Sequence, residues 1–393
     1  MTDLKKNVPE LRFPEFSGEW EENTISDFLT ESMIEGNKGN DAKKLTVKLW
    51  GKGVIPKNEV HKGSSNTQYY KRKKGQLMYG KLDFLNCAFG IVPPHLDGYE
   101  STIDSPAFDF INGDSRFVLE RIMQKSFYQK YGEKANGSRK AKRINQKDFL
   151  AMQLYSPIIN EQQKIGDFFS KLDRQIELEE QKLALLEEQK KGYMQKIFSQ
   201  ELRFKDDNGN DYPKWEIKQL KDIADFQNGK AHETLISSNG KYVLVNSKFI
   251  STDAQVKKYV FEQLTPLNKG DVTIVMSDVP NGRALAKCFL VDEDNKYSLN
   301  QRIGRIYNII GNSRFLYTVL NRNKQLLKYD NGVGQTNLKK SEITDVFITC
   351  PIKEEQQKIG DFFNKLDQLI EKQSRKVELL KQRKKGLLQK MFV

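Results

Sequence analysis

The sequence predicts an α+β fold with two globular domains, each followed by a long helix, and the two helices paired as an antiparallel coiled coil with pseudo-twofold symmetry. Three observations lead to this prediction. One segment of the chain is duplicated, and both copies carry a heptad pattern. The unlike stretches that precede the copies combine short strand patterns with a single helical pattern.

The duplication is visible in Glu161–Phe169, with the sequence Glu-Gln-Gln-Lys-Ile-Gly-Asp-Phe-Phe, which recurs unchanged at Glu355–Phe363. The two copies stay in register through a Lys-Lys-Gly near their ends. At the other end of each unlike stretch, Trp20 corresponds to Trp215 in a shorter match. The chain is therefore organised as unlike, repeated, unlike, repeated.

The repeated segments are predicted to be long coiled-coil helices. Steps of four and three residues from Ile165, and from Ile359 in the second copy, reach apolar residues at eight of ten positions in each copy. This spacing is typical of the a and d positions of a coiled-coil seam. The predicted seam contains Leu172, Ile176, Glu179, Leu183, Leu186 and Lys190 in the first helix, and Ile370, Gln373, Val377, Leu380, Lys384 and Leu387 in the second.

The two helices can pair parallel or antiparallel, and a duplicated chain favours the antiparallel arrangement because it is compatible with a pseudo-twofold axis. The polar seam positions then help to select the register. The preferred register places Glu179 against Lys384, and it also places Lys190 against Gln373. Another antiparallel register would set Lys384 against Leu172, where a lone charge would face an apolar layer unless the lysine snorkelled to water.

Apolar residues outside the seam allow two interpretations. A two-stranded coil would leave many of them exposed, so they either pack on the protein's own globular domains or meet helices of a partner that complete a larger bundle. Because the coil is expected to be pseudo-symmetric, the second interpretation predicts two copies of the partner. The residues expected to face that partner are Phe168, Met194, Phe362 and Leu388.

Each unlike stretch mixes strand patterns with one helical pattern that begins with Ser-Arg-Phe, and each ends in an apolar run leading to a proline, Pro157 or Pro351. In the first stretch we expect a helix at 115–129 and strands at 46–50, 76–79, 88–92 and 149–155. In the second we expect a helix at 313–321 and strands at 242–245, 271–276, 284–291 and 345–349.

Composition and charge exclude several classes of protein. No apolar run is long enough to span a membrane or to form a secretory signal, so we expect a cytoplasmic protein with no membrane partner. Three scattered cysteines and three histidines that lie apart from them argue against a disulfide framework or a zinc module, and no metal site is predicted. The formal net charge of +13 over 393 residues favours a polyanionic partner, most commonly nucleic acid.

Polar and basic loops in both stretches carry the side chains that contact DNA. Arg, Lys, Asn and Gln read base edges, whereas Ser, Tyr and Lys reach phosphates. Any one of these residues could instead belong to an ordinary polar turn, so the prediction concerns the loops as groups. The DNA-binding candidates are Ser65, Asn66, Gln68, Tyr69, Lys71, Arg72, Lys73, Ser138, Arg139, Lys142, Arg143, Ser247, Lys248, Asn281, Arg283, Gln301, Arg302, Gln335 and Asn337.

Signatures of catalysis are missing from the sequence. An adenine methyltransferase holds a flipped base with Asn or Asp followed by Pro-Pro-Phe/Tyr, and the nearest approach, Val92-Pro93-Pro94-His95, lacks both ends of that motif. A Gly-Lys-Gly at 51–53 lacks the spacing of a phosphate-binding loop. We therefore expect a protein that binds rather than reacts, with no catalytic residue and no cofactor of its own.

Two unlike domains, each followed by a nearly identical helix with Glu-Gln-Gln-Lys-Ile-Gly-Asp-Phe-Phe and Lys-Lys-Gly, resemble the specificity subunit of a Type I restriction-modification system. The resemblance is residue-specific mainly in 157–200 and 351–393. It implies target-recognition domains at 1–157 and 201–351, with spacer helices at 158–200 and 352–393.

The resemblance also implies a function and partners. Such subunits are not enzymes, and they read a bipartite site on double-stranded DNA, one half with each domain; since the domains differ in sequence here, the half-sites should differ as well. They assemble with two modification subunits, which bring S-adenosylmethionine and methylate adenine. Two restriction subunits, which use ATP and magnesium for translocation and cleavage, complete the full complex.

Two other classes of function stay open at this point. A coiled-coil scaffold whose two domains bind proteins would have no DNA role, whereas a DNA reader loses affinity steeply as the salt concentration rises. A stand-alone nuclease or methyltransferase with degenerate motifs would be active without partners.

Overall fold

The computed structural model describes residues 7–57, 64–133, 143–280 and 282–393. The chain divides into two compact units: unit 1 comprises Met1–Gln181 and Ser374–Val393, and unit 2 comprises Lys182–Gln373. These units differ from the four segments expected from the sequence, because each unit takes one part of each long helix.

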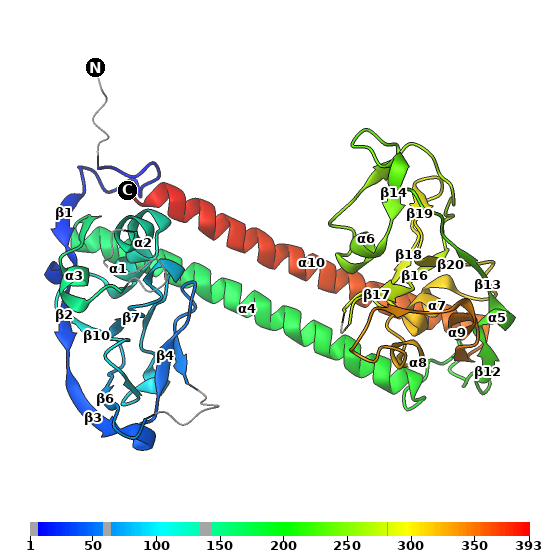
Figure 1. Cartoon of the computed structure of the whole chain (residues 1–393), viewed down its shortest axis with the longest axis horizontal. Helices are drawn as coiled ribbons and strands as arrows, with labels where there is room; N and C mark the ends of the chain where they lie inside the picture. Colours follow the sequence, from blue (N-terminus) through cyan, green and yellow to red (C-terminus); the bar gives the residue numbers. More distant parts are fainter. Residues whose placement is uncertain (1–6, 58–63, 134–142, 281) are drawn as a thin grey trace. The chain divides into compact units, whose positions relative to one another are not determined.

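Unit 1 combines strands and helices of the first unlike stretch with parts of both long helices (Figure 1). Its strands are β1 (Glu21–Thr24), β2 (Leu29–Ser32), β3 (Ile34–Lys38), β4 (Leu45–Val47), β5 (Val54–Pro56), β6 (Gln68–Lys71), β7 (Leu77–Tyr79), β8 (Phe89–Ile91), β9 (Glu100–Ser101), β10 (Ala107–Phe110) and β11 (Gln153–Ser156). Its helices are α1 (Ser115–Ile122), α2 (Lys125–Gly132), α3 (Gln146–Leu150), the first part of α4 (Ile159–Phe198) and the last part of α10 (Lys353–Met391).

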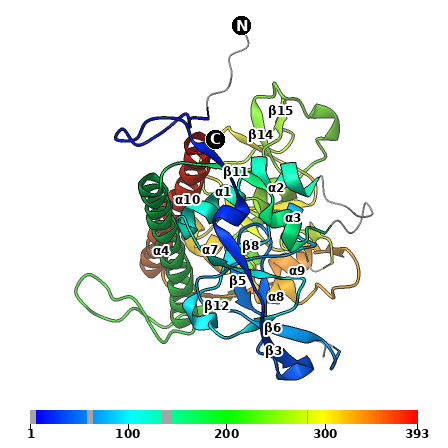
Figure 2. The ribbon, with the colours of Figure 1, turned by 90° about the vertical axis from the view of Figure 1, so that its left-hand side faces the viewer.

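An antiparallel sheet in the order β2-β10-β7-β8 is the centre of unit 1. Buried aromatic rings cover one face of it, with Tyr79 stacked on Phe108 and tilted against Phe149 of α3. The hairpin of β4 and β5 packs on a second buried cluster that includes Met78. A separate sheet, β3-β6-β9, places β3 and β6 at the end of unit 1 that is remote from α1, α2 and α3 (Figure 2).

Unit 2 is built from the second unlike stretch and the remaining parts of the long helices. Its strands are β12 (Glu216–Gln219), β13 (Asp225–Asn228), β14 (Tyr242–Val245), β15 (Tyr259–Val260), β16 (Val272–Val275), β17 (Ser277–Asp278), β18 (Cys288–Leu290), β19 (Tyr297–Leu299), β20 (Ile303–Tyr307), β21 (Thr336–Asn337) and β22 (Phe347–Cys350). Its short helices are α5 (Leu220–Ile223), α6 (Ser247–Ser251), α7 (Ser313–Leu320), α8 (Lys324–Leu327) and α9 (Lys340–Thr344).

The two units share a frame and differ in one sheet. The order β13-β20-β16-β18 repeats that of β2-β10-β7-β8, and the pair β12-β22 repeats β1-β11. The third sheet differs, because unit 2 has the order β15-β14-β19 with β14 parallel to β19, whereas β3-β6-β9 is antiparallel throughout. The predicted α+β fold with two globular parts and two long helices is confirmed.

Some predicted elements have different bounds in the structure. The helix expected at 115–129 is two helices, because the chain turns at Met123 and Gln124 between α1 and α2. The strand expected at 149–155 begins as the end of α3, whose cap Asn145 accepts a hydrogen bond from the Asp148 amide, and β11 starts only at Gln153. Hydrophobic pattern alone does not separate a buried short helix from a strand.

A buried ion pair holds the start of α4 in unit 1. The carboxylate of Glu161 is fully buried, and it accepts hydrogen bonds from Nε and Nη2 of Arg12 at 2.8 and 2.7 Å. Unit 2 repeats the contact: Glu355 is fully buried and accepts from Arg203, with the shorter bond at 2.7 Å. The indole of Trp215 donates to the same carboxylate at 2.9 Å.

These arginines belong to a short repeat that the sequence analysis missed. Leu-Arg-Phe occurs at 11–13 and again at 202–204, and we call these segments the arms. Phe13 packs edge-on against Phe168 with ring centroids 5.9 Å apart, and Phe204 packs against Phe362 at 5.7 Å. Each arm therefore covers the same face at the start of a long helix.

The glycine of the repeated motif is required by a close approach. A Cβ on Gly166 would lie 2.2 Å from Oδ1 of Asp114, the residue that caps α1 by accepting from two backbone amides. In unit 2, a Cβ on Gly360 would lie 2.6 Å from Oδ1 of Asn312, the cap of α7. Glycine thus lets the capped helix end touch the long helix.

Within unit 1, α4 and α10 run antiparallel. Asp173 pairs with Lys384 at 2.8 Å, whereas Glu179, further along α4, pairs with Lys376, earlier in α10, at 2.5 Å. The predicted register with Glu179 against Lys384 is therefore wrong. The structure has the other antiparallel register, in which Lys384 lies beside Leu172 and its neighbour Asp173.

Unit 2 has the same direction and register in its own parts of the helices. Lys190 pairs with Asp367 at 2.5 Å, and the ring of Tyr193 packs against that of Phe362. Along both helices the predicted seam positions are buried or half-buried: Leu172, Ile176, Glu179, Leu183, Leu186, Lys190, Ile370, Gln373, Val377, Leu380, Lys384 and Leu387.

The lone-charge argument failed because Lys384 has a partner from outside the helix pair. Its ammonium group contacts Glu120 of α1 at 2.9 Å as well as Asp173. Burial raises the pKa of Glu120 above its ordinary value, and the nearby Lys384 opposes that rise. Burial acts to lower the pKa of Lys384, but Glu120 and Asp173 outweigh it, and the pKa of Lys384 is raised.

The four residues predicted to face a partner pack within their own units instead. Phe168 and Phe362 are half-buried under the arms, while Met194 and Leu388 are half-buried against the cores. The apolar side chains of the long helices that do remain exposed are Leu178, Leu185, Leu369 and Leu379.

Replacing Gly166 by alanine should destabilise the protein, because the new Cβ would displace the cap of α1. We expect a loss of about 1–3 kcal/mol in the free energy of unfolding, measured by urea titration. The matched control is Gly386→Ala in the same unit, where a Cβ meets nothing within 4 Å. That change should stabilise by about 0.5–1 kcal/mol, since alanine is the better helix former. Equal effects would contradict the close approach.

Glu120→Gln should change how stability depends on pH. Since the pKa of Glu120 is raised in the folded state, the folded protein holds more protons than the unfolded chain above the ordinary glutamate pKa of about 4.3. Stability from this group is complete below that pH and is lost as the pH rises. Urea unfolding at a series of pH values should show the wild type losing stability relative to Glu120→Gln. A constant difference across the series would contradict the raised pKa.

Candidate nucleic-acid interface

The first candidate loop leads into β6 in unit 1. Ser65 and Asn66 are exposed before the strand, and Lys71 and Lys73 are exposed at its end. Gln68 is half-buried, and its side-chain amide donates to the carbonyl oxygen of Gly36 on β3 at 3.0 Å, so it is occupied within the sheet. The exposed members form a polar, basic border on β6.

Two candidates in this loop are interior residues, and their assignment to DNA is corrected. Arg72 is fully buried, and its guanidinium donates to the Ser101 hydroxyl at 2.8 Å and to the Ser32 carbonyl at 3.0 Å. Burial lowers the pKa of Arg72 to about 10, which leaves it charged at neutral pH. Tyr69 is also buried, with the ammonium group of Lys44 5.0 Å from its ring centroid.

The second candidate loop of unit 1 is described only at its end. Ser138, Arg139 and Lys142 lie outside the described residues. Arg143 is exposed and lies 3.6 Å from the carboxylate of Asp104, which is also exposed.

In unit 2, several candidates lie on strands that are joined side by side. Ser277 of β17 is paired with Asn337 of β21, and the side-chain amide of Gln335 donates to the Ser277 hydroxyl at 2.7 Å. The backbone amide of Met276 donates to the carbonyl oxygen of Arg302. Gln335, Asn337 and Arg302 are exposed, so this junction presents an amide-rich and basic edge.

The remaining candidates of unit 2 border the same junction. The backbone amide of Asn300, just before Gln301 and Arg302, donates to Val245, two residues before Ser247 of α6. Lys248 and Gln301 are exposed and Ser247 is half-buried. Asn281 lies outside the described residues, and the exposed Arg283 follows it. The structure therefore brings the described candidates of unit 2 onto neighbouring loops.

Two loop tips next to this junction are held by local hydrogen bonds. The Asp278 carboxylate accepts from the amides of Val279, Ala284 and Leu285, and the Asn331 side chain accepts from the amide of Val333. Val279 and Val333 are exposed by 63% and 85%. Exposed apolar tips on ordered loops suit contact with a thymine methyl group.

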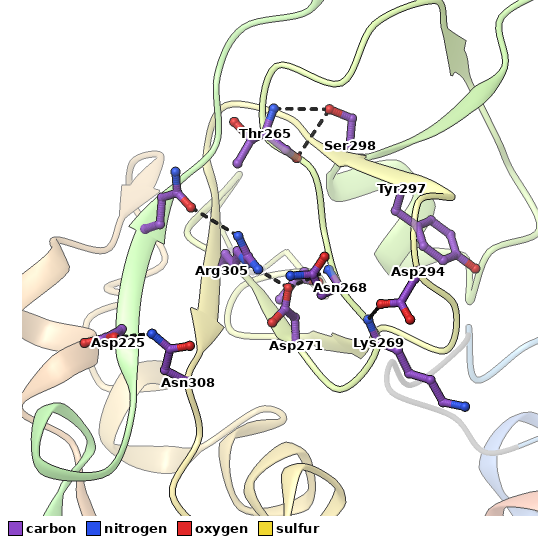
Figure 3. Close-up of polar contacts among 12 residues, drawn as sticks. Asp225, Thr265, Asn268, Lys269, Asp271, Asp294, Tyr297, Ser298, Arg305 and Asn308 are labelled. Atoms are coloured by element: carbon purple, nitrogen blue, oxygen red, sulfur yellow. Dashed lines mark hydrogen bonds and ion pairs between the residues drawn. The ribbon is translucent and has the colours of Figure 1, made fainter.

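A polar network stiffens the sheet beneath these loops (Figure 3). Arg305 of β20 donates to Asp271 at 2.7 Å, and Asn308 donates to Asp225 of β13 at 2.7 Å. The side chain of Lys269 extends away from these contacts, while its backbone amide donates to Asp294 (Figure 3). The network fixes strand positions and leaves a cation pointing outward.

Each unit has a hollow at the equivalent place. In unit 1 a hollow of about 1100 Å³ is lined by Lys74, Arg116 and parts of α4, and in unit 2 one of about 470 Å³ is lined by Lys269 and Arg314. In both, the lysine precedes a glycine and the arginine comes from the repeated Ser-Arg-Phe. These hollows add positive charge to both units.

Chemistry beyond binding finds no support in the described part of the chain. No group of three His, Cys, Asp or Glu side chains there could hold a metal ion. The three thiols are buried, and burial raises the pKa of Cys87 to about 11, which suppresses the reactive thiolate. Among the described helices, none combines the length and apolar character needed to cross a bilayer.

The sequence analysis missed the hairpin of β4 and β5. Its signal is a run of lysines without an acidic residue around Trp50, an exposed aromatic side chain. The strand expected at 46–50 ends at Val47, and Trp50 lies in the turn.

A family model described as Type I restriction modification DNA specificity domain matches residues 119–188 and 212–381. The chain belongs to this family. The resemblance drawn from the repeated motif is therefore confirmed. The Type I restriction enzyme MjaVIII specificity subunit of Methanocaldococcus jannaschii is 24% identical over 298 residues, which cover 70% of this chain and 68% of that protein.

Solved structures of specificity-family proteins have a similar fold. The S subunit of the Type I restriction-modification system from M. genitalium matches with a TM-score of 0.63 and 15% identity, over 98% of this chain and 99% of that one. A chain from a study of complex assembly and conformational transition of the type I R-M system matches with a TM-score of 0.50 and 14% identity, over 95% and 97% of the two chains.

Lys71 and Arg72 are neighbours whose substitution should have opposite effects. Lys71→Gln should weaken binding to duplex DNA and reduce the salt slope by about one, with stability unchanged. Arg72→Gln should lower the free energy of unfolding by about 1–3 kcal/mol, because it leaves buried acceptors unpaired. Fluorescence anisotropy of a labelled duplex and urea unfolding measure the two effects. Unchanged stability in Arg72→Gln would contradict the structural role.

Proposed function

We propose that this chain is the DNA specificity subunit of a Type I restriction-modification complex and that it reads a bipartite, asymmetric DNA target. In this proposal each unit carries one reader. The observation that carries it is the contrast between the units: they share the frame, the arms and the identical helix motif, but the sheets and loops that hold the DNA-binding candidates differ. Different readers on one frame suit two unlike half-sites.

Charge and side-chain chemistry support DNA as the ligand. The net charge is +13, and the exposed candidates in both units are mainly Lys, Arg, Asn and Gln. These residue types read base edges and neutralise phosphates. A scaffold that binds only proteins would not need this composition at the loop edges.

Catalysis is assigned to partners in this proposal. Two modification subunits would bring S-adenosylmethionine and methylate adenine, and two restriction subunits would bring ATP and magnesium-dependent cleavage in the full, cytoplasmic complex. This chain would bind none of these cofactors. Its exposed Leu178, Leu185, Leu369 and Leu379 are available for helix contacts with such partners.

The long helices would act as a spacer between the readers. Each long helix contributes to both units, so its length would enter the distance between the two half-sites. If both readers use one face of B-DNA, their centres should lie about one helical turn, or 10 bp, apart.

Inserting one heptad after Leu183 of α4 and one before Gln373 of α10 should widen the unread gap of the target. Seven helical residues add about 10 Å, which corresponds to no more than about three base pairs. Methylated adenines are mapped across the genome of cells that carry the complete system with the wild-type chain, with the inserted chain, or without the chain.

The wild-type chain should direct methylation to two unlike short sequences at a fixed spacing, and methylation should disappear without it. A retained target with an unchanged gap in the inserted chain would refute the spacer role alone. Methylation that persists at the same sites without the chain would refute the proposed function.

A further inference from the structure

The turn between β4 and β5 exposes a large aromatic side chain. Trp50 is 60% exposed, whereas Trp20 and Trp215 are buried at 2% and 9%. An indole ring left in water forgoes the burial that stabilises most tryptophans, so its exposure points to a partner.

The backbone holds this ring in a strained but fixed position. Trp50 has a φ of +62°, a left-handed conformation that is uncommon for a bulky residue. Its amide donates to the carbonyl oxygen of Asn86 at 2.8 Å, and the amide of Gly51 donates to that of Cys87 at 2.8 Å. Strain that is maintained by such bonds is characteristic of functional positions.

The surrounding segment is uniformly basic. Residues 42–57, which we call the basic hairpin, contain five lysines and no acidic residue. Four of these lysines, Lys43, Lys48, Lys52 and Lys57, are exposed. A segment of this charge favours a polyanion over a protein surface, where lysine is depleted at interfaces.

We propose that the basic hairpin is a DNA contact of unit 1, in which the ring of Trp50 stacks on a nucleobase while Lys48 and Lys52 neutralise the flanking phosphates. Aromatic stacking suits any base, since every base has a π face, and the lysines add salt-dependent affinity. The proposal rests on the proposed function and names a contact residue for the reader of unit 1. Unit 2 has no counterpart, because its tryptophan, Trp215, is buried.

Trp50→Asn removes the ring and keeps a residue that tolerates left-handed backbone. The control, Ile111→Asn, removes another 60%-exposed apolar side chain of unit 1. Binding of the full chain to a labelled duplex with the mapped target is measured by anisotropy at several salt concentrations. We expect Trp50→Asn to bind about tenfold to a hundredfold more weakly, and Ile111→Asn to bind as the wild type does. Unfolding of both variants should match the wild type, which excludes loss of fold as the cause.

Tryptophan fluorescence gives an independent readout, because Trp50 is the exposed indole of the three. Acrylamide should quench the wild type, adding the duplex should protect it, and Trp50→Asn should have no quenchable fraction. If the duplex binds with normal salt dependence but Trp50 stays quenchable and Trp50→Asn binds normally, the inference is wrong and the proposed function stands. Protection by the modification subunits without DNA would also overturn it, in favour of a protein contact. If the wild type shows no salt-dependent binding, both proposals fail.

Discussion

A buried carboxylate at the start of each long helix is the interaction on which the two units depend. Removing a carboxylate from water is costly, and the cost is offset only when its charge and its hydrogen-bonding capacity are met together. The planar guanidinium of Arg12 or Arg203 meets both in one contact with Glu161 or Glu355. Because the arginine lies on an arm far from the helix in sequence, the pair fixes the arm, and the arm in turn brings its phenylalanine over the helix face. The glycine one turn further along the helix then admits the capped end of α1 or α7.

The sequence predicted the parts of the fold that repeat locally. Heptads and an identical motif defined both long helices because the pattern is written in consecutive residues, and the α+β class followed from short strand patterns between them. The register was wrong because it depends on Glu120, which reaches Lys384 from α1. No local pattern announces that partner. Likewise the break between α1 and α2, and the helix α3 before β11, depend on caps and tertiary packing rather than on hydrophobic spacing.

The candidate interface was predictable as a set of loops but not residue by residue. Lys71 and Arg72 are adjacent cations, yet one is exposed and the other is enclosed by acceptors from Ser32 and Ser101, which come from distant strands. Composition cannot separate them. In unit 2 the candidates did gather, because β17, β21 and the end of β19 are joined through backbone bonds. Trp50 escaped prediction because its neighbours have strand propensity, and only the turn geometry shows that its ring is left in water.

The same lysine of the repeat serves the two units differently, and this explains how one frame carries unlike readers. Lys384 joins α10 to α4 and also to Glu120 of the reader in unit 1. Its counterpart Lys190 pairs with Asp367, and Thr318, which stands where Glu120 stands in α1, bonds to the carbonyl oxygen of Arg314 in its own helix. The helix pair therefore satisfies the lysine with its own aspartate, and an additional acid from the reader is optional. Identity is demanded only where cap, arm and helix meet, so the loops beyond the frame are free to differ.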